Sequence, residues 1–175
     1  MRIVAIFDSR LFSFRYPNEK NHELKRLLKL WNNPVYIIDF ITQHAVDAPK
    51  GINALQLATQ IENDAVTIDD YLLKLGKNPQ GNFEFFFKSL DNNEFQIKSL
   101  SKRKGRKNYL RLYAIRIDNN CFVITGGAIK FTKLMQDKEH TKIELQKLER
   151  CREFLKNKGI LDAESYFEFI QEQNS

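Results

Sequence analysis

The spacing of the apolar residues changes near residue 80, and this change constrains the fold more than any other feature of the chain. Between residues 18 and 76, apolar side chains recur at intervals of three and four, the spacing of amphipathic helices. After a turn rich in Gly, Asn and Pro at residues 76–81, apolar and polar residues alternate, as in half-buried strands. A 175-residue chain with separate helical and strand-forming regions is predicted to have an α+β fold.

Two β-hairpins are predicted, one on each side of the helical region. The first joins Arg2–Phe7 to Leu11–Arg15, and the second joins residues 109–117 to residues 121–125 through a polar turn. Gly126-Gly127 is expected to interrupt the last of these strands.

Capping signals predict where two of the helices begin. Asn33 is an expected N-cap, because Pro34 suits the first helical position after it. Thr141 and Glu144 have the spacing of a capping box, which predicts a helix from Thr141 to about Asn157. We divide the chain into an N-terminal hairpin and helical region (1–81) and a basic α+β region with C-terminal helices (82–175). The two regions are expected to form one compact unit.

The positive charge of the chain is concentrated in one segment. Residues 82–126 hold nine basic and four acidic side chains, whereas residues 1–81 hold ten and nine, and residues 127–175 hold nine of each. No acidic residue lies between Phe95 and Ile117. The basic residues of that stretch are Lys98, Lys102, Arg103, Lys104, Arg106, Lys107, Arg111 and Arg116. A local surplus of cations favours a phosphate backbone as the partner.

Strand alternation places aromatic residues beside one of these cations. Tyr109, Arg111 and Tyr113 would share one face, and Leu110 and Leu112 the other. We expect the leucine face to be buried and the tyrosine face to be exposed or grooved beside the basic loop. Arginine can bind phosphate through two hydrogen bonds and tyrosine can stack on bases, so this face is predicted to bind single-stranded RNA. A solvated basic hairpin without a ligand is the alternative interpretation.

Three further residues could take part in the same site. Lys130 and Lys133 could close one wall of a basic groove, although lysines at a strand-to-helix junction are commonly just exposed. His140 precedes the expected capping box and could act as a general acid or base. More often, a histidine near a helix N-terminus has no chemical role.

Other functional classes have little support in the sequence. Cys121 and Cys151 are predicted to be buried thiols rather than a disulfide. The histidines and cysteines lack the spacing of a metal site, so neither a metal nor another cofactor is expected. No apolar run reaches the length of a membrane span, and the N-terminus lacks a secretory signal. A cytoplasmic protein without a membrane partner is therefore expected.

Six segments follow one another in an order that resembles a known family. They are Phe86–Leu90, Glu94–Lys98, Tyr109–Tyr113, Phe122–Thr125, Ile129–Lys133 and the helix from Thr141. This order resembles the RelE/HigB-like toxins of bacterial type II toxin–antitoxin systems. In that family a strand leads to a basic loop, then to a strand with an arginine beside aromatic residues, and later to a lysine-rich turn. The resemblance covers roughly residues 83–157, whereas Gly126-Gly127 and the helical region 18–76 depart from it.

The resemblance implies a fold, an activity and a set of site residues. The implied fold is a small antiparallel sheet with packed helices. The family cleaves messenger RNA without a metal ion, often on the ribosome, by attack of the RNA's own 2′-hydroxyl on the adjacent phosphate. Basic side chains stabilise the charge that develops on the phosphoryl oxygens. By position, Arg111, Lys130 and Lys133 match the catalytic residues, but no histidine or carboxylate matches the expected base. Lys102 and Arg106 match only the general basic loop of the family. Together with the basic stretch and the strand alternation described above, the predicted RNA-binding residues are Lys98, Lys102, Arg103, Lys104, Arg106, Lys107, Tyr109 and Tyr113.

The resemblance also implies partners, namely RNA, which can be ribosome-bound mRNA, and an antitoxin protein. Two hypotheses without catalysis fit the same basic segment. One is a nucleic-acid-binding module whose helical region docks a partner, and the other is a protein-interaction domain whose basic loop docks an acidic protein.

Overall fold

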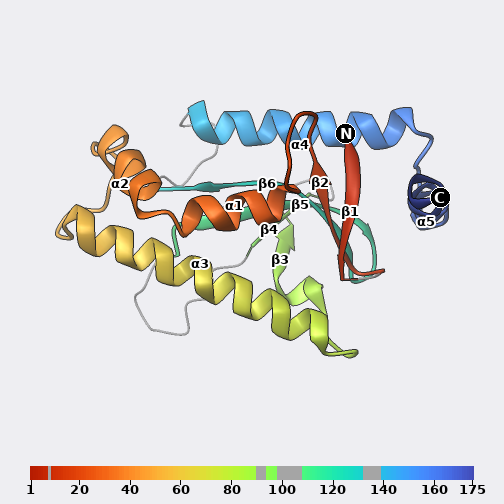
Figure 1. The fold of residues 1–175 in the computed structure, drawn as a ribbon, viewed down its shortest axis with the longest axis horizontal. Coiled ribbons are helices and arrows are strands. Elements are labelled where there is room, and N and C mark those ends of the chain that lie inside the picture. The colour runs from red at the N-terminus through yellow and green to blue at the C-terminus, as the bar shows by residue number, and fades with distance from the viewer. Residues whose placement is uncertain (8, 90–93, 98–107, 132–138) are drawn as a thin grey trace.

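A computed structural model describes residues 1–7, 9–89, 94–97, 108–131 and 139–175 (Figure 1). Its centre is a six-stranded sheet with the strand order β1-β2-β6-β5-β4-β3. Strands β2 and β6 run parallel, and the other neighbouring strands run antiparallel. The strands are β1 (Arg2–Phe7), β2 (Leu11–Arg15), β3 (Phe87–Ser89), β4 (Glu94–Ile97), β5 (Leu110–Asp118) and β6 (Cys121–Ile129). The predicted α+β class is confirmed, and the parallel pair makes the sheet mixed rather than purely antiparallel.

The helices follow the predicted order, with one difference, at the start of α4. They are α1 (Glu23–Trp31), α2 (Pro34–Gln43), α3 (Ala54–Lys77), α4 (Glu139–Asn157) and α5 (Ala163–Asn174), and a short 3-10 helix covers Phe83–Phe85. Asn33 caps α2 as predicted, because its side chain accepts hydrogen bonds from the amides of Val35 and Tyr36. The predicted capping box is wrong, since Thr141 lies inside α4.

Helices cover both faces of the sheet, which explains why its central strands are buried. On one face, Leu110, Leu112 and Ile124 pack in a single core with residues of α1, α2 and α3. On the other face, the side chains of β5 and β6 pack against α4 and α5. Figure 1 shows α4 and α3 on opposite sides of the sheet. Every residue of β6 is buried, as expected for a strand enclosed by two layers.

Gly126-Gly127 does not interrupt β6, contrary to the prediction, but allows close packing on both of its faces. A Cβ atom at Gly126 would collide with the Glu144 carboxylate of α4. At Gly127 it would lie 2.9 Å from the side chains of Leu27 and Trp31 in α1. The two glycines therefore let α1 and α4 approach the strand closely.

The N-terminal hairpin is joined to the rest of the fold through Arg10. Its guanidinium donates hydrogen bonds to the carbonyls of Gly76 (2.6 Å), Asn78 (3.0 Å) and Gly81 (2.9 Å), at and just beyond the end of α3. Leu11, which follows it, lies in the same core as the β5 leucines. The hairpin and the helical region thus share one hydrophobic core with the central strands.

Candidate functional site

Most of the predicted loop cations lie outside the described residues. These are Lys98, Lys102, Arg103, Lys104, Arg106, Lys107 and Lys133. Their predicted contact with RNA stays a prediction. The described part of the site is where the chain enters β5 at Asn108 and leaves β6 at Lys130, because Lys130 donates its backbone N–H to the carbonyl of Tyr109 at 2.7 Å.

Arg111 is a half-buried cation without a carboxylate partner among the described residues. Its Nη1 donates to the backbone carbonyls of Asn108 and Leu110, both at 2.7 Å. Burial lowers the pKa of the guanidinium, because the charged form has lost part of its hydration. A cation that is removed from water and faces only carbonyl dipoles is suited to bind an anion.

The prediction that Tyr109 and Tyr113 lie on an exposed face is wrong. Tyr113 is fully buried against Ala128 and Leu148, because α4 covers this face of the sheet. Tyr109 is 9% exposed and packs edge-on against Phe131, with ring centroids 5.5 Å apart. In this arrangement neither ring is free to stack on a base. Burial raises the pKa of both phenols, so both stay protonated at neutral pH.

Lys130 is also more enclosed than a lysine at a strand end usually is. It is 7% exposed, so the expectation of a solvated lysine at this junction is wrong. It follows Ile129, which pairs with Leu110, the residue before Arg111. The backbones that carry two of the predicted catalytic residues, Arg111 and Lys130, thus lie on neighbouring strands at the same end of the sheet.

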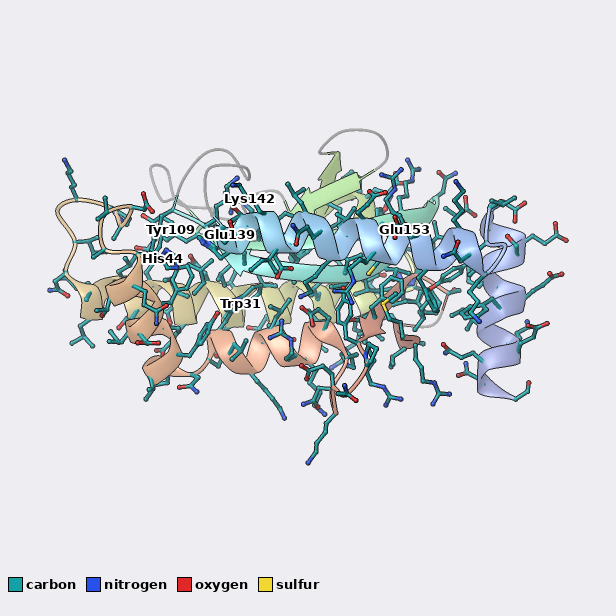
Figure 2. All side chains as sticks on the ribbon, turned by 90° about the horizontal axis from the view of Figure 1, so that it is seen from above. Trp31, His44, Tyr109, Glu139, Lys142 and Glu153 are labelled. Carbon is teal, nitrogen blue, oxygen red and sulfur yellow. The ribbon has the colours of Figure 1, made fainter. Side chains whose placement is uncertain are left out.

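Two histidines meet at this end of the sheet, and their pairing was not predicted from the sequence. His44 is the C-cap of α2 and His140 lies in the first turn of α4. Their ring centroids are 4.6 Å apart, and both rings pack against Phe40, at 4.3 and 5.2 Å. Figure 2 shows His44 and Tyr109 together at the end of the molecule where α4 begins at Glu139. The two histidines are distant in the sequence, so no local pattern indicates that they meet.

The backbone of β6 fixes the position of His140. Strand β2 pairs with β6 only at residues 122–124. Beyond that point, side chains complete the open edge of β6. Tyr16 donates its hydroxyl to Thr125 O, Glu144 accepts from Gly127 N at 2.9 Å, and the His140 Nε2 lies 3.0 Å from Ile129 O.

The spacing of these contacts explains how α4 docks on the strand. His140 and Glu144 are one helical turn apart, about 6 Å along the helix. Gly127 and Ile129 are two strand residues apart, about 6.6–6.8 Å along β6. Because the two spacings nearly match, α4 can make both contacts at once.

Next to His140 along α4 lies a cluster in which two buried carboxylates are paired with half-buried cations. Lys147 bonds to the carboxylate of Glu23 and lies 3.3 Å from that of Glu144. Arg26 donates two hydrogen bonds to Glu23, at 2.7 and 2.8 Å. Burial opposes the ionisation of Glu23, but the bonds from Arg26 and Lys147 outweigh it and lower its pKa. For Glu144 burial dominates and raises the pKa. We assign this cluster a structural role, because it links α1, α4 and β6.

A groove of about 520 Å³ lies at the other end of β5, between that strand and the second half of α4. Its charges balance. The charged residues that line it are Arg116, Arg152, Lys156, Glu149, Glu153 and Asp162. Arg116 pairs with Glu84 at 2.6 Å and Arg152 with Glu149 at 3.1 Å. The formal charges that line this groove therefore sum to zero.

Other predictions concern cysteines, metals and membranes. Cys121 and Cys151 are free and buried, as predicted, and burial raises the pKa of each thiol to about 12. Over the described ranges, no group of three or more His, Cys, Asp or Glu residues is arranged to hold a metal ion. None of the helices in those ranges has the length and apolar character of a membrane span.

Comparisons with known proteins assign no family to the chain. No protein-family model, curated protein or solved structure matches it. Its function is therefore inferred from the chemistry of its own residues.

Proposed function

We propose that this protein is a toxin-like endoribonuclease of a toxin–antitoxin system that binds and cleaves RNA in the cytoplasm. The observation that carries the proposal is Arg111, the half-buried guanidinium that lacks a carboxylate partner in the described part of the chain. Six basic residues lie between residues 98 and 107, immediately before the strand that carries it. A cation of this kind beside a basic segment suits a phosphate group of a polynucleotide.

The reaction we propose uses the RNA's own 2′-hydroxyl as the nucleophile. It attacks the adjacent phosphorus, and negative charge builds on the non-bridging oxygens. Arg111 would stabilise that charge, and Lys130 and Lys133 would supply further positive potential from the end of β6. The substrate would be mRNA, either free or on the ribosome, and a cognate antitoxin would hold the toxin inactive.

A pair of arginines on the same strand tests this assignment. Arg111→Ala removes the unneutralised cation, whereas Arg116→Ala removes an arginine that pairs with Glu84 at the other end of β5. Each variant is expressed alone in bacteria, and purified protein is incubated with RNA in EDTA, with and without ribosomes. We expect growth arrest and RNA cleavage from the wild type and from Arg116→Ala, and neither from Arg111→Ala.

Two results would contradict the proposal. Cleavage by Arg111→Ala at the wild-type rate would remove Arg111 from the site. Salt-sensitive binding of RNA that stays intact in every condition would replace the nuclease with a non-catalytic binding module.

A further inference from the structure

We propose that His44 is the proton donor of the cleavage reaction and that His140 is the residue that positions it. This inference rests on the proposed function and adds to it a residue of the N-terminal helical region. That region lies outside the part of the chain on which the family resemblance rests. Helix α2 would thus complete a site whose cations come from the strands.

The contact with β6 determines which nitrogen of His140 carries a proton. A backbone carbonyl can only accept a hydrogen bond, so the Nε2 that lies 3.0 Å from Ile129 O must be protonated. This bond holds the His140 ring against the strand. The other nitrogen, Nδ1, is buried, so it is shielded from a substrate. His140 is therefore suited to orient a neighbour rather than to contact RNA.

His44 differs from His140 in its exposure and in its hydrogen bonding. Its ring is only half-buried, and its nitrogens make no hydrogen bond within the described residues. The ring is held by packing against Phe40 and His140. A half-exposed imidazole that is fixed in place and retains its hydrogen-bonding capacity can exchange a proton with a substrate.

The closeness of the two rings limits how many proton transfers the pair can serve. In an in-line displacement, the attacking 2′-oxygen and the leaving 5′-oxygen lie on opposite sides of phosphorus. Rings whose centroids are 4.6 Å apart lie on the same side. One histidine therefore meets the substrate and the other supports it.

We assign His44 to the leaving-group side, because an alkoxide departs poorly without a proton. The 2′-oxygen forms a bond to phosphorus and its proton passes to a solvent base. The bond from phosphorus to the 5′-oxygen breaks, and the His44 imidazolium gives its proton to that oxygen. The products are a 2′,3′-cyclic phosphate and a 5′-hydroxyl, and His44 is reprotonated from solvent.

The experiment compares variants of the three histidines in the full-length protein. Single-turnover cleavage and RNA binding are measured for His44→Ala and for His22→Asn, with circular dichroism to confirm folding. His22 caps α1, where its Nδ1 accepts from the Lys25 amide, and asparagine preserves that cap. We expect His44→Ala to lose about 10²–10⁴-fold in cleavage rate, with RNA affinity retained. His22→Asn should match the wild type.

Two further readouts separate proton transfer from a merely structural effect. Added imidazole should partly restore cleavage by His44→Ala. An RNA with a bridging 5′-sulfur, which departs without a proton, should be cut by this variant at nearly the wild-type rate.

The positioning role of His140 is tested by two variants. Glutamine keeps an N–H that can reach Ile129 O, so His140→Gln should retain more activity than His140→Ala.

The outcomes distinguish this inference from the function on which it rests. If the wild type leaves RNA intact, both fail. If the wild type cleaves RNA and His44→Ala cleaves it equally well, only the role of His44 fails. An equal defect of His44→Ala on the normal and sulfur-substituted RNAs would also exclude His44 as the proton donor.

Discussion

Two polar regions lie along α4, and they differ in how their charges are balanced. Around Lys147, each buried charge faces one of opposite sign, and Glu144 also accepts a bond from Gly127. At the end of the sheet near the start of α4, Arg111 donates to two backbone carbonyls and has no carboxylate partner among the described residues. The His44 ring likewise has no hydrogen-bond partner among the described side chains and backbone. The two regions therefore have different roles. Mutually satisfied groups hold the fold together, and groups left without a counterpart are the ones suited to a ligand.

The largest effect should come from breaking the balanced region. Lys147→Met removes the cation that lies between Glu23 and Glu144 and leaves buried carboxylates without it. Removing one partner of a buried ion pair costs about 3–5 kcal/mol, so the free energy of unfolding, measured by urea denaturation, should fall by that amount. Lys142→Met is the control on the same helix, because Lys142 is exposed and lies 4.0 Å from Glu139. It should change stability by less than about 1 kcal/mol. Equal losses for the two variants would contradict this account.

Packing between β6 and α4 should give a smaller but clear effect. Gly126→Ala places a methyl group where the Glu144 carboxylate lies, so the helix or the side chain must move. We expect a loss of about 1–3 kcal/mol in unfolding free energy. The same substitution in a Glu144→Ala background should cost less, because the collision is gone. A double-mutant cycle checks this, and additive costs would show that the close approach has no energetic consequence.

These glycines also mark the limit of what the sequence could predict. Local patterns predicted the N-terminal hairpin, the Asn33 cap of α2, and the buried face that contains Leu110 and Leu112. They failed at Gly126-Gly127, because an isolated glycine pair indicates a break unless the neighbouring helix is known. Burial of Tyr113 was missed for the same reason, since strand alternation does not say whether a second layer covers the other face.

The candidate site was predictable to a lesser degree than the fold. The basic, acid-free stretch points to Arg111, and the structure adds that Arg111 has no carboxylate partner among the described residues. His140 was considered as an acid or base from its place before a helix. Its contacts with His44 and Ile129 depend on tertiary packing and register, which no local motif encodes.

Arg111→Met should have a small effect on stability, opposite in sign to that of Lys147→Met. Methionine fills similar space without a charge that must be kept from water. The free energy of unfolding should stay constant or rise by up to about 1 kcal/mol, while RNA binding falls. Urea denaturation and a salt-dependent RNA-binding assay on the same preparation test both parts. A loss of stability as large as that of Lys147→Met would show that Arg111 belongs to the structural group.

The smallest effect we predict is a dependence on pH that separates the two carboxylates of the balanced region. The pKa of Glu144 is raised by burial, so its contribution to stability is complete below its unfolded pKa. That contribution is lost as the pH rises through the folded pKa. Glu23 has a lowered pKa, so its contribution is present above the unfolded pKa and is lost as the pH falls through the folded value.

The measurement is the unfolding free energy of the wild type minus that of Glu144→Gln, followed as a function of pH. This difference should decrease as the pH rises towards neutrality from about 4, which is near the ordinary pKa of a glutamate. Glu23→Gln should show the opposite slope. The opposite result would be a difference between the wild type and Glu144→Gln that increases with pH. It would mean that the contacts with Lys147 and Gly127 stabilise ionised Glu144 by more than burial destabilises it, so that the two carboxylates behave alike.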